Sequence, residues 1–360
     1  MIIYWKGWVK QALFFKMAII PTYNDYSEKE RHFTVIHIDS KQDFDKYFEN
    51  FKEQKNSIWR GLNESKYKLY TSLQRFWIEN DFKDDIEEVI SYIDHSSTFG
   101  LSWNNNFLKK YFVNNYISEN QLFACLSFLR HHGNPSPLMD WSRNLNVALY
   151  FASKYSLIKP SNSEVENRFT LYELTSEHPH FKINYKDLAK EFWTKNEEKL
   201  RLEYKSPKEE NPNFLANFIK SIIGNKYFLF AEIKEKKGAM FRIEDKENDE
   251  YEFYVNNNYN ITNQDGLFLI NTHPVNPIEE SLENEVNRLF QKANLNNDQL
   301  KETANQKHTK NLIAYEIHKN LAEYVLHKIA QEGINDKFIY PDPNQLTSDC
   351  LKDYLSKPSK

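Results

Sequence analysis

The spacing of hydrophobic and polar residues along the chain predicts both strands and helices. Residues 32–38, HFTVIHI, alternate in the way a half-buried strand does. The following stretch, 39–51, places four aromatic side chains three and four residues apart, as on one face of a helix. Residues 57–62, SIWRGL, then predict a short buried strand. The N-terminal third of the protein therefore begins as strand, helix and strand.

The same patterns continue through the rest of the chain. From about 72 to 132, apolar residues at helical spacing predict a helical insert between strands. Residues 312–333 have a helical period with a stop at Gly333. A charged stretch over about 176–225, rich in Lys, Glu and Asn, predicts a helical excursion. Four further segments predict strands: RFTLYELT (168–175), KYFLFAEIK (226–234), EYEFYV (250–255) and GLFLI (266–270).

Together these segments predict one α+β domain over residues 33–345. We expect a mixed, mainly antiparallel β core with helical insertions and a helical C-terminal part. An amphipathic extension, 1–32, precedes the domain, and a helix or tail, 346–360, follows it.

The extension begins with an apolar, aromatic stretch that lysines interrupt. No apolar run in it reaches the roughly 20 residues that a membrane span needs, so no integral membrane association is expected. A helix here either packs on the domain, which is the favoured interpretation, or lies on a membrane surface.

Charge and cysteine content narrow the possible partners. The chain has 47 basic and 51 acidic residues, a formal net charge of −4, which gives no support for a general polyanion-binding surface. A local basic pocket remains compatible with that balance. The two cysteines, Cys125 and Cys350, form neither a metal-binding spacing nor a disulfide framework, which fits a cytoplasmic location. The oligomeric state is not determined by the sequence.

One stretch, 125–155, concentrates polar groups that bind anions or move protons. It predicts a helix-turn-helix, in which Arg130, His131 and His132 end the first helix; their structural role would be to complement the helix dipole. Ser142 or Asn144 would begin the second helix, whose first turn offers free N–H groups to an anion. A metal-dependent hydrolase is a weaker interpretation, because adjacent histidines rarely bind one ion; we expect no metal.

Asp140 and Arg60 each allow a structural and a functional interpretation. Asp140 either caps a helix or holds a neighbouring side chain, or it contacts a ribose hydroxyl or steers a proton. Arg60, beside Gly61, either forms a salt bridge or binds phosphate, for which its planar fork is well suited. Arg75 offers a second cation. The combination predicts a nucleotide site, in which Arg60, Arg130, His132 and Asp140 converge on one pocket.

Five blocks of the sequence resemble, in order, the signature blocks of the FRG domain family. They are Trp-Arg-Gly (59–61), LYTSLQR (69–75), LRHHGNPSPLMDWSRNLNVALYFA (129–152), NQDGLFLI (263–270) and EGINDKFIYPD (332–342). The resemblance covers roughly residues 33–345. FRG domains occur widely in bacteria and phages, often beside defence genes, so the resemblance implies a toxin or an antiphage role.

A more distant likeness is to ADP-ribosyltransferases. It implies an ADP-ribosyltransferase-like β core and NAD as substrate or ligand. Arg60, with Gly61, Arg75, Arg130 and His131, would bind the cofactor, and Asp140 with Ser142 would line the ribose. In those enzymes a glutamate on a late strand stabilises the oxocarbenium-like transition state.

The late strand of this chain departs from that pattern. Gln264 begins the corresponding triplet, but Gly266 occupies the place of the catalytic glutamate, and Asn260 stands where the family tends to carry an arginine. Either Asp140 supplies the carboxylate, or catalysis is slow, or the fold binds a nucleotide without cleaving it. His132 is favoured over His131 as a general base.

Two functions therefore stay open. One is an NAD-consuming enzyme that transfers ADP-ribose to water or to a protein or nucleic-acid acceptor. The other is a non-catalytic nucleotide-binding sensor.

Overall fold

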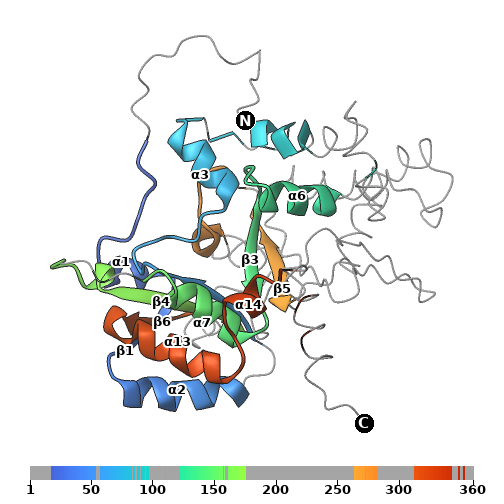
Figure 1. The fold of residues 1–360 in the computed structure, drawn as a ribbon. Coiled ribbons are helices and arrows are strands. Elements are labelled where there is room, and N and C mark those ends of the chain that lie inside the picture. Colours follow the sequence, from blue (N-terminus) through green and yellow to red (C-terminus); the bar gives the residue numbers. More distant parts are fainter. Residues whose placement is uncertain are drawn as a thin grey trace, which may run out of the picture.

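A six-stranded sheet forms the centre of the protein (Figure 1). The computed structural model describes residues 18–53, 57–82, 122–156, 161–175, 263–271, 273–281 and 312–342, with scattered positions elsewhere. In these residues the strand order is β1-β6-β4-β2-β3-β5, and β1 and β6 alone run parallel. The strands are β1 (Thr34–Ile38), β2 (Ser57–Leu62), β3 (Leu138–Ser142), β4 (Arg168–Thr175), β5 (Gly266–Ile270) and β6 (Leu312–His318). The predicted α+β class with a mixed, mainly antiparallel sheet is confirmed.

Helices cover the sheet and cap its ends. The described α-helices are α1 (Tyr26–Lys29), α2 (Lys41–Glu53), α3 (Ser72–Glu79), α6 (Leu122–His131), α7 (Leu145–Ser153), α13 (Ala322–Gln331) and α14 (Asp336–Ile339), with 3₁₀ turns η1 (Glu164–Glu166) and η3 (Lys319–Leu321). Helices α2, α7 and α13 share one apolar core with one face of the sheet. A second core lies on the other face and includes Tyr23, Phe33, Leu69 and Met139.

Several predicted elements are confirmed almost to the residue. The strands at 32–38, 57–62, 168–175 and 266–270 correspond to β1, β2, β4 and β5, and the helix at 39–51 to α2. Ser40 accepts the N–H of Asp43 at the start of α2, 3.1 Å away. Gly333, at φ +85°, follows the last helical residue of α13 and ends it as predicted.

Two segments differ from the prediction because distant strands pair with them. Residues 125–155 are not a helix-turn-helix: β3 lies between α6 and α7 and pairs with β5, Asp140 opposite Phe268. Residues 312–318 are a strand and not a helix, because β6 lies between β1 and β4 and bonds to both. Pairing with distant strands overrides the predicted turn at 138–142 and the helical period at 312–318.

Other predictions fall outside the described residues. They concern residues 1–17, the excursion at 176–225, the strands at 226–234 and 250–255, and most of the tail at 346–360. Helices α3 and α6 are the described ends of the predicted helical insert. No helix in the described part of the chain is long and apolar enough to cross a membrane.

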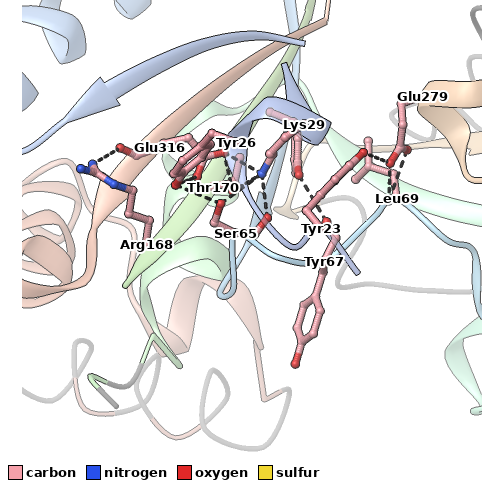
Figure 2. Close-up of polar contacts among 11 residues, drawn as sticks. Tyr23, Tyr26, Lys29, Ser65, Tyr67, Leu69, Arg168, Thr170, Glu279 and Glu316 are labelled. Atoms are coloured by element: carbon pink, nitrogen blue, oxygen red, sulfur yellow. Dashed lines mark hydrogen bonds and ion pairs between the residues drawn. The ribbon is translucent and has the colours of Figure 1, made fainter. Parts of the chain in front are cut away.

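A buried ion pair ties the segment before β1 into the sheet (Figure 2). Lys29 Nζ lies 2.6 Å from a carboxylate oxygen of Glu316, and both side chains have no exposed surface. The same ammonium group donates to Ser65 O at 2.8 Å and to Thr170 Oγ1 at 3.1 Å. Tyr26 also donates to Glu316, at 3.2 Å. Part of the predicted extension is therefore buried in the domain.

Tyr23 fixes the same segment at a second point. Its hydroxyl group donates to the buried carboxylate of Glu279, which also accepts the N–H of Leu69 at 3.3 Å (Figure 2). The Tyr23 N–H donates to Lys66 O at 2.8 Å, and Thr22 forms an isolated bridge with Tyr67. Residues 22 and 23 are thus held against the chain that connects β2 to α3.

Candidate functional site

Arginines from three elements meet near the start of β3. Arg60, on β2, donates through Nη1 to the backbone carbonyl of Asp140. Arg130, in the last turn of α6, places Nη2 2.7 Å from Oδ2 of Asp140. Arg75, on α3, donates through Nη1 to Tyr70 O at 3.2 Å. Three of the predicted residues, Arg60, Arg130 and Asp140, are therefore brought together.

Ser136 explains how α3 and α6 reach the same end of β3 (Figure 1). Its carbonyl group accepts the N–H of Leu73 in α3 at 3.1 Å, and its hydroxyl group donates to Leu126 O in α6 at 3.2 Å. A capping box of Thr71 and Gln74 starts α3 and fixes its direction. The loop before β3 therefore sets where Arg75 and Arg130 lie relative to Asp140.

The charges of this cluster act on one another. Withdrawal from bulk water raises the pKa of Asp140, but Arg130 and Arg60 outweigh it, so the pKa lies below its ordinary value. Loss of solvent, with repulsion from Arg130 and Arg75, lowers the pKa of Arg60 to about 10, against the attraction of Asp140. The pKa of Arg75 is also lowered, by loss of solvent and then by Arg130. Near neutral pH the cluster holds three cations and an ionised carboxylate.

Most hydrogen-bond donors of these arginines are unused. A guanidinium group carries several N–H donors, but Arg60, Arg75 and Arg130 each donate one hydrogen bond in the described structure. The Nε atoms of Arg60 and Arg130 and the indole nitrogen of Trp141 are buried and have no acceptor there. Buried donors without partners are rare and costly, so these groups form an incomplete hydrogen-bond network.

Arg60 and Arg75 line a pocket of about 610 Å³. Glu79 is the acidic residue in its wall, and Lys68, also in the wall, is paired with Glu28 at 3.0 Å. The remaining wall is mostly apolar or aromatic: Ala18, Ile19, Ile20, Pro21, Thr22, Leu62, Tyr67, Leu69, Tyr70 and Met139. The pocket wall thus combines two arginines with mostly apolar and aromatic side chains.

Gly61 serves packing rather than ligand contact. A Cβ atom on Gly61 would lie 1.9 Å from the carbonyl oxygen of Ala148 and 2.6 Å from the nitrogen of Ala152. Consecutive strand residues point to opposite faces, so Gly61 faces α7 while Arg60 faces the pocket. The backbone of α7 occupies the space beside Gly61, which gives a physical reason for glycine there.

The two histidines differ in their surroundings. Loss of solvent around the ring, with repulsion from Arg130 and His132, lowers the pKa of His131 to about 4, although Asp140 opposes the shift. His131 therefore stays neutral near pH 7, and the residue as a whole is exposed. His132 is exposed and packs on Phe128, with ring centroids 4.2 Å apart. The imidazole that is coupled to Asp140 is that of His131, and the predicted convergence of His132 is not observed.

Ser142 and Gln264 form hydrogen bonds that connect the end of β3 to the residues just before β5 and to α14. Ser142 donates to the carbonyl group of Gln264 at 2.6 Å, and the Gln264 amide group donates to Ile339 O at 3.1 Å. Asn144, not Ser142, caps α7, and its side chain accepts the N–H groups of Asn146 and Val147. The cap thus uses two of the N–H groups that the sequence analysis expected this helix start to offer to an anion.

Sequence reasoning missed the walls of the pocket. Residues 18–22 and Tyr67 are neighbours because Thr22 forms a β-bridge with Tyr67. The two bridge partners are more than forty positions apart in the sequence. Glu79 carries no distinguishing motif. The one available signal was the block LYTSLQR, which contains both Tyr70 and Arg75.

The fold and this cluster define an α+β protein with an arginine-lined pocket between β2 and α3. The family model described as the FRG domain matches residues 55–159, and the chain contains an FRG domain there. The match includes β2, α3, α6, β3 and α7, so it covers Arg60, Arg75, Arg130 and Asp140. Searches of curated proteins and of solved structures gave no match.

Proposed function

We propose that the pocket binds a phosphate-bearing nucleotide, with NAD as the first ligand to test. The observation that carries this proposal is the set of unused donors on Arg60 and Arg75, which line the pocket and each make one hydrogen bond in the described structure. Arg130 is not in the pocket wall and acts on it through repulsion of these two arginines. A phosphate group offers several acceptor oxygens in the geometry that a guanidinium fork contacts in pairs. An anion here would complete a network that the protein leaves incomplete.

The charge balance supports the same ligand class. Arg60 and Arg75 share the pocket wall with one carboxylate, that of Glu79, so the wall keeps an excess of positive charge. The pKa shifts of Arg60 and Arg75 record repulsion among the arginines. A bound polyphosphate would replace that repulsion with attraction, and it would do so most strongly where water is partly excluded.

Cleavage of NAD is the second candidate, and Asp140 is the observation that favours it. Its carboxylate is ionised and its side chain is 42% exposed. Asp140 follows Met139 of the pocket wall but is not itself in that wall, so cleavage requires the ribose to extend beyond the pocket. A nearby carboxylate stabilises the positive charge that develops as nicotinamide leaves. In this candidate the chain is ADP-ribosyltransferase-like, transfers ADP-ribose to water, protein or nucleic acid, and acts as a toxin or antiphage effector. The Arg130 pair already engages Asp140, so binding without cleavage is the simpler proposal.

Calorimetric titration with NAD, together with measurement of nicotinamide release, tests both candidates. We expect Arg60→Gln to weaken NAD binding by at least about tenfold, since it removes a phosphate contact of about 1.4 kcal/mol or more. Arg31→Gln, which removes an exposed arginine elsewhere, is the matched control and should bind NAD like the parent protein.

The Asp140→Asn variant separates binding from chemistry. If the chain cleaves NAD, this variant should bind it and release no nicotinamide. Equal NAD affinity in the parent protein and in Arg60→Gln would contradict the proposed function.

A further inference from the structure

The pocket has more apolar wall than a phosphate ion needs. Arg60 and Arg75 share the wall with Lys68 and Glu79, whereas Leu62, Tyr67 and residues 18–22 supply apolar and aromatic surface. The pocket volume of about 610 Å³ lies within the range of roughly 300–1,000 Å³ typical of small-molecule sites. A phosphate group bound to the arginines would leave the apolar part of the wall without a contact.

Tyr67 contributes an exposed aromatic ring to the pocket wall. Its side chain keeps 42% of its surface exposed, and Figure 2 shows the ring projecting away from the Lys29 network. The backbone of Tyr67 is fixed, because its carbonyl group accepts the hydroxyl group of Tyr172 at 3.4 Å and Thr22 bridges to it. A ring in a fixed position with a free face suits stacking against a flat group.

The segment beside Tyr67, which bridges to it through Thr22, also lines the pocket. Ile19 and Ile20 belong to the pocket wall, and Ile19 is 89% exposed. Tyr23, a few residues further on, anchors the segment through Lys66 O and Glu279. The pocket therefore has two apolar walls, one from the segment before α1 and one from the connection between β2 and α3.

We propose that Tyr67 and the segment 18–22 form a base-binding wall, so that the pocket selects a nucleotide over a bare polyphosphate. The inference rests on the proposed function, because the arginines must hold the phosphates of the same ligand. Stacking of a base on an aromatic side chain is sequence-tolerant, and replacing that side chain by alanine weakens binding by about tenfold. Tyr67 is a specificity residue in this arrangement, and Arg60 supplies affinity for every phosphate-bearing ligand.

Titration with ADP and with inorganic pyrophosphate separates the two contributions. The parent protein should bind ADP at least about tenfold more tightly than pyrophosphate. Tyr67→Ala should lose about tenfold for ADP and leave pyrophosphate binding unchanged. Tyr67→Phe keeps the ring and should bind ADP like the parent protein. Arg60→Gln should weaken the binding of both ADP and pyrophosphate.

Two further variants serve as a second test and a control. Ile20→Ser removes apolar surface from the segment 18–22 of the pocket wall and should also reduce the preference for ADP. Tyr155→Ala removes another exposed aromatic residue, 59% exposed and outside the pocket wall, and should change neither affinity. Thermal unfolding of each variant shows whether it is folded.

The outcomes distinguish the inference from the proposed function. Equal binding of ADP and pyrophosphate, unaffected by Tyr67→Ala but weakened by Arg60→Gln, would overturn the base-binding wall and leave the phosphate site standing. Binding of neither ligand would overturn the phosphate site and, with it, the inference.

Discussion

Two cationic regions of this protein, one around Lys29 and one around Arg60, Arg75 and Arg130, differ in how far their charges are paired within the protein. The Lys29 ammonium group is fully buried and contacts Glu316, Ser65 and Thr170, so its donors are used within the protein. The guanidinium groups of Arg60, Arg75 and Arg130 are only partly buried and donate one hydrogen bond each in the described structure. The first region is complete without a ligand, and the second is not.

The energetic cost of a buried charge explains the difference. Burial lowers the pKa of Lys29, and the Glu316 carboxylate opposes that shift. The pair is tolerated because hydrogen bonds satisfy both partners. The arginines instead keep repulsion and unpaired donors close together, which lowers the pKa of Arg60. Unpaired donors and repulsion between like charges in one cluster are typical of a ligand-binding site. Complete pairing of a buried charge is typical of a structural ion pair.

The largest expected change in the free energy of unfolding comes from breaking the buried Lys29–Glu316 ion pair. Lys29→Met leaves the buried Glu316 carboxylate without its cation, and we expect a loss of about 3–5 kcal/mol in the free energy of unfolding. Urea denaturation at neutral pH measures it. Replacing Glu316 by glutamine in the same chain removes the unpaired charge and should recover part of the loss.

The matched control is an exposed pair of the same kind. Lys66 lies 2.7 Å from Glu166, with side chains 31% and 37% exposed. Lys66→Met should cost about 1 kcal/mol or less, because exposed ion pairs contribute little. Equal losses of unfolding free energy in Lys29→Met and Lys66→Met would contradict a structural role for the buried Lys29 pair. The contrast with the arginine cluster would then have no support.

A second variant sharpens the comparison on a single strand. Gly61→Ala should destabilise the protein by about 1–3 kcal/mol, because the new methyl group meets the backbone of α7. Arg60→Gln, next to it on the opposite face, should change stability by less than about 1 kcal/mol. Thermal unfolding compares the two. A destabilised Arg60→Gln with unchanged Gly61→Ala would reverse the roles assigned to the two faces of β2.

The smallest effect concerns pH and the anchor of the pocket wall. Burial raises the pKa of Glu279 above its ordinary value of 4.5, against the hydrogen bond from Tyr23. The folded state thus favours the protonated carboxyl group, so its contribution to stability is fully present below about pH 4.5 and is lost as the pH rises through the folded-state pKa.

Glu279→Gln cannot ionise and lacks this loss. Its free energy of unfolding relative to the parent protein should increase between about pH 5 and about pH 8, by about 1 kcal/mol or less. Urea titrations at the two pH values measure the change. A constant difference between Glu279→Gln and the parent protein at the two pH values would argue against the buried carboxyl group as the source.

Much of the fold followed from local pattern, and the failures have one cause. The aromatic stripe of α2 and the alternation in β1 predicted those elements, since one buried face imposes a period. The segments 138–142 and 312–318 were misassigned because their backbone groups bond to strands far along the chain. The domain boundaries at 33 and 345 stay predictions, although Tyr23 and Lys29 already belong to the core.

For the candidate site, the sequence by itself determined which chemical groups were available. Arg60, Arg75, Arg130 and Asp140 stood out because cations and a carboxylate beside turns and apolar strands need a physical reason. Only the tertiary structure decided how they are used. The loop at Ser136 holds α3 and α6 at the same end of β3. His131, not His132, interacts with the charge of Asp140. Residues 18–22 form part of the pocket wall. Residue types fix charge and donor capacity, whereas distance and burial depend on contacts between segments that the linear order does not contain.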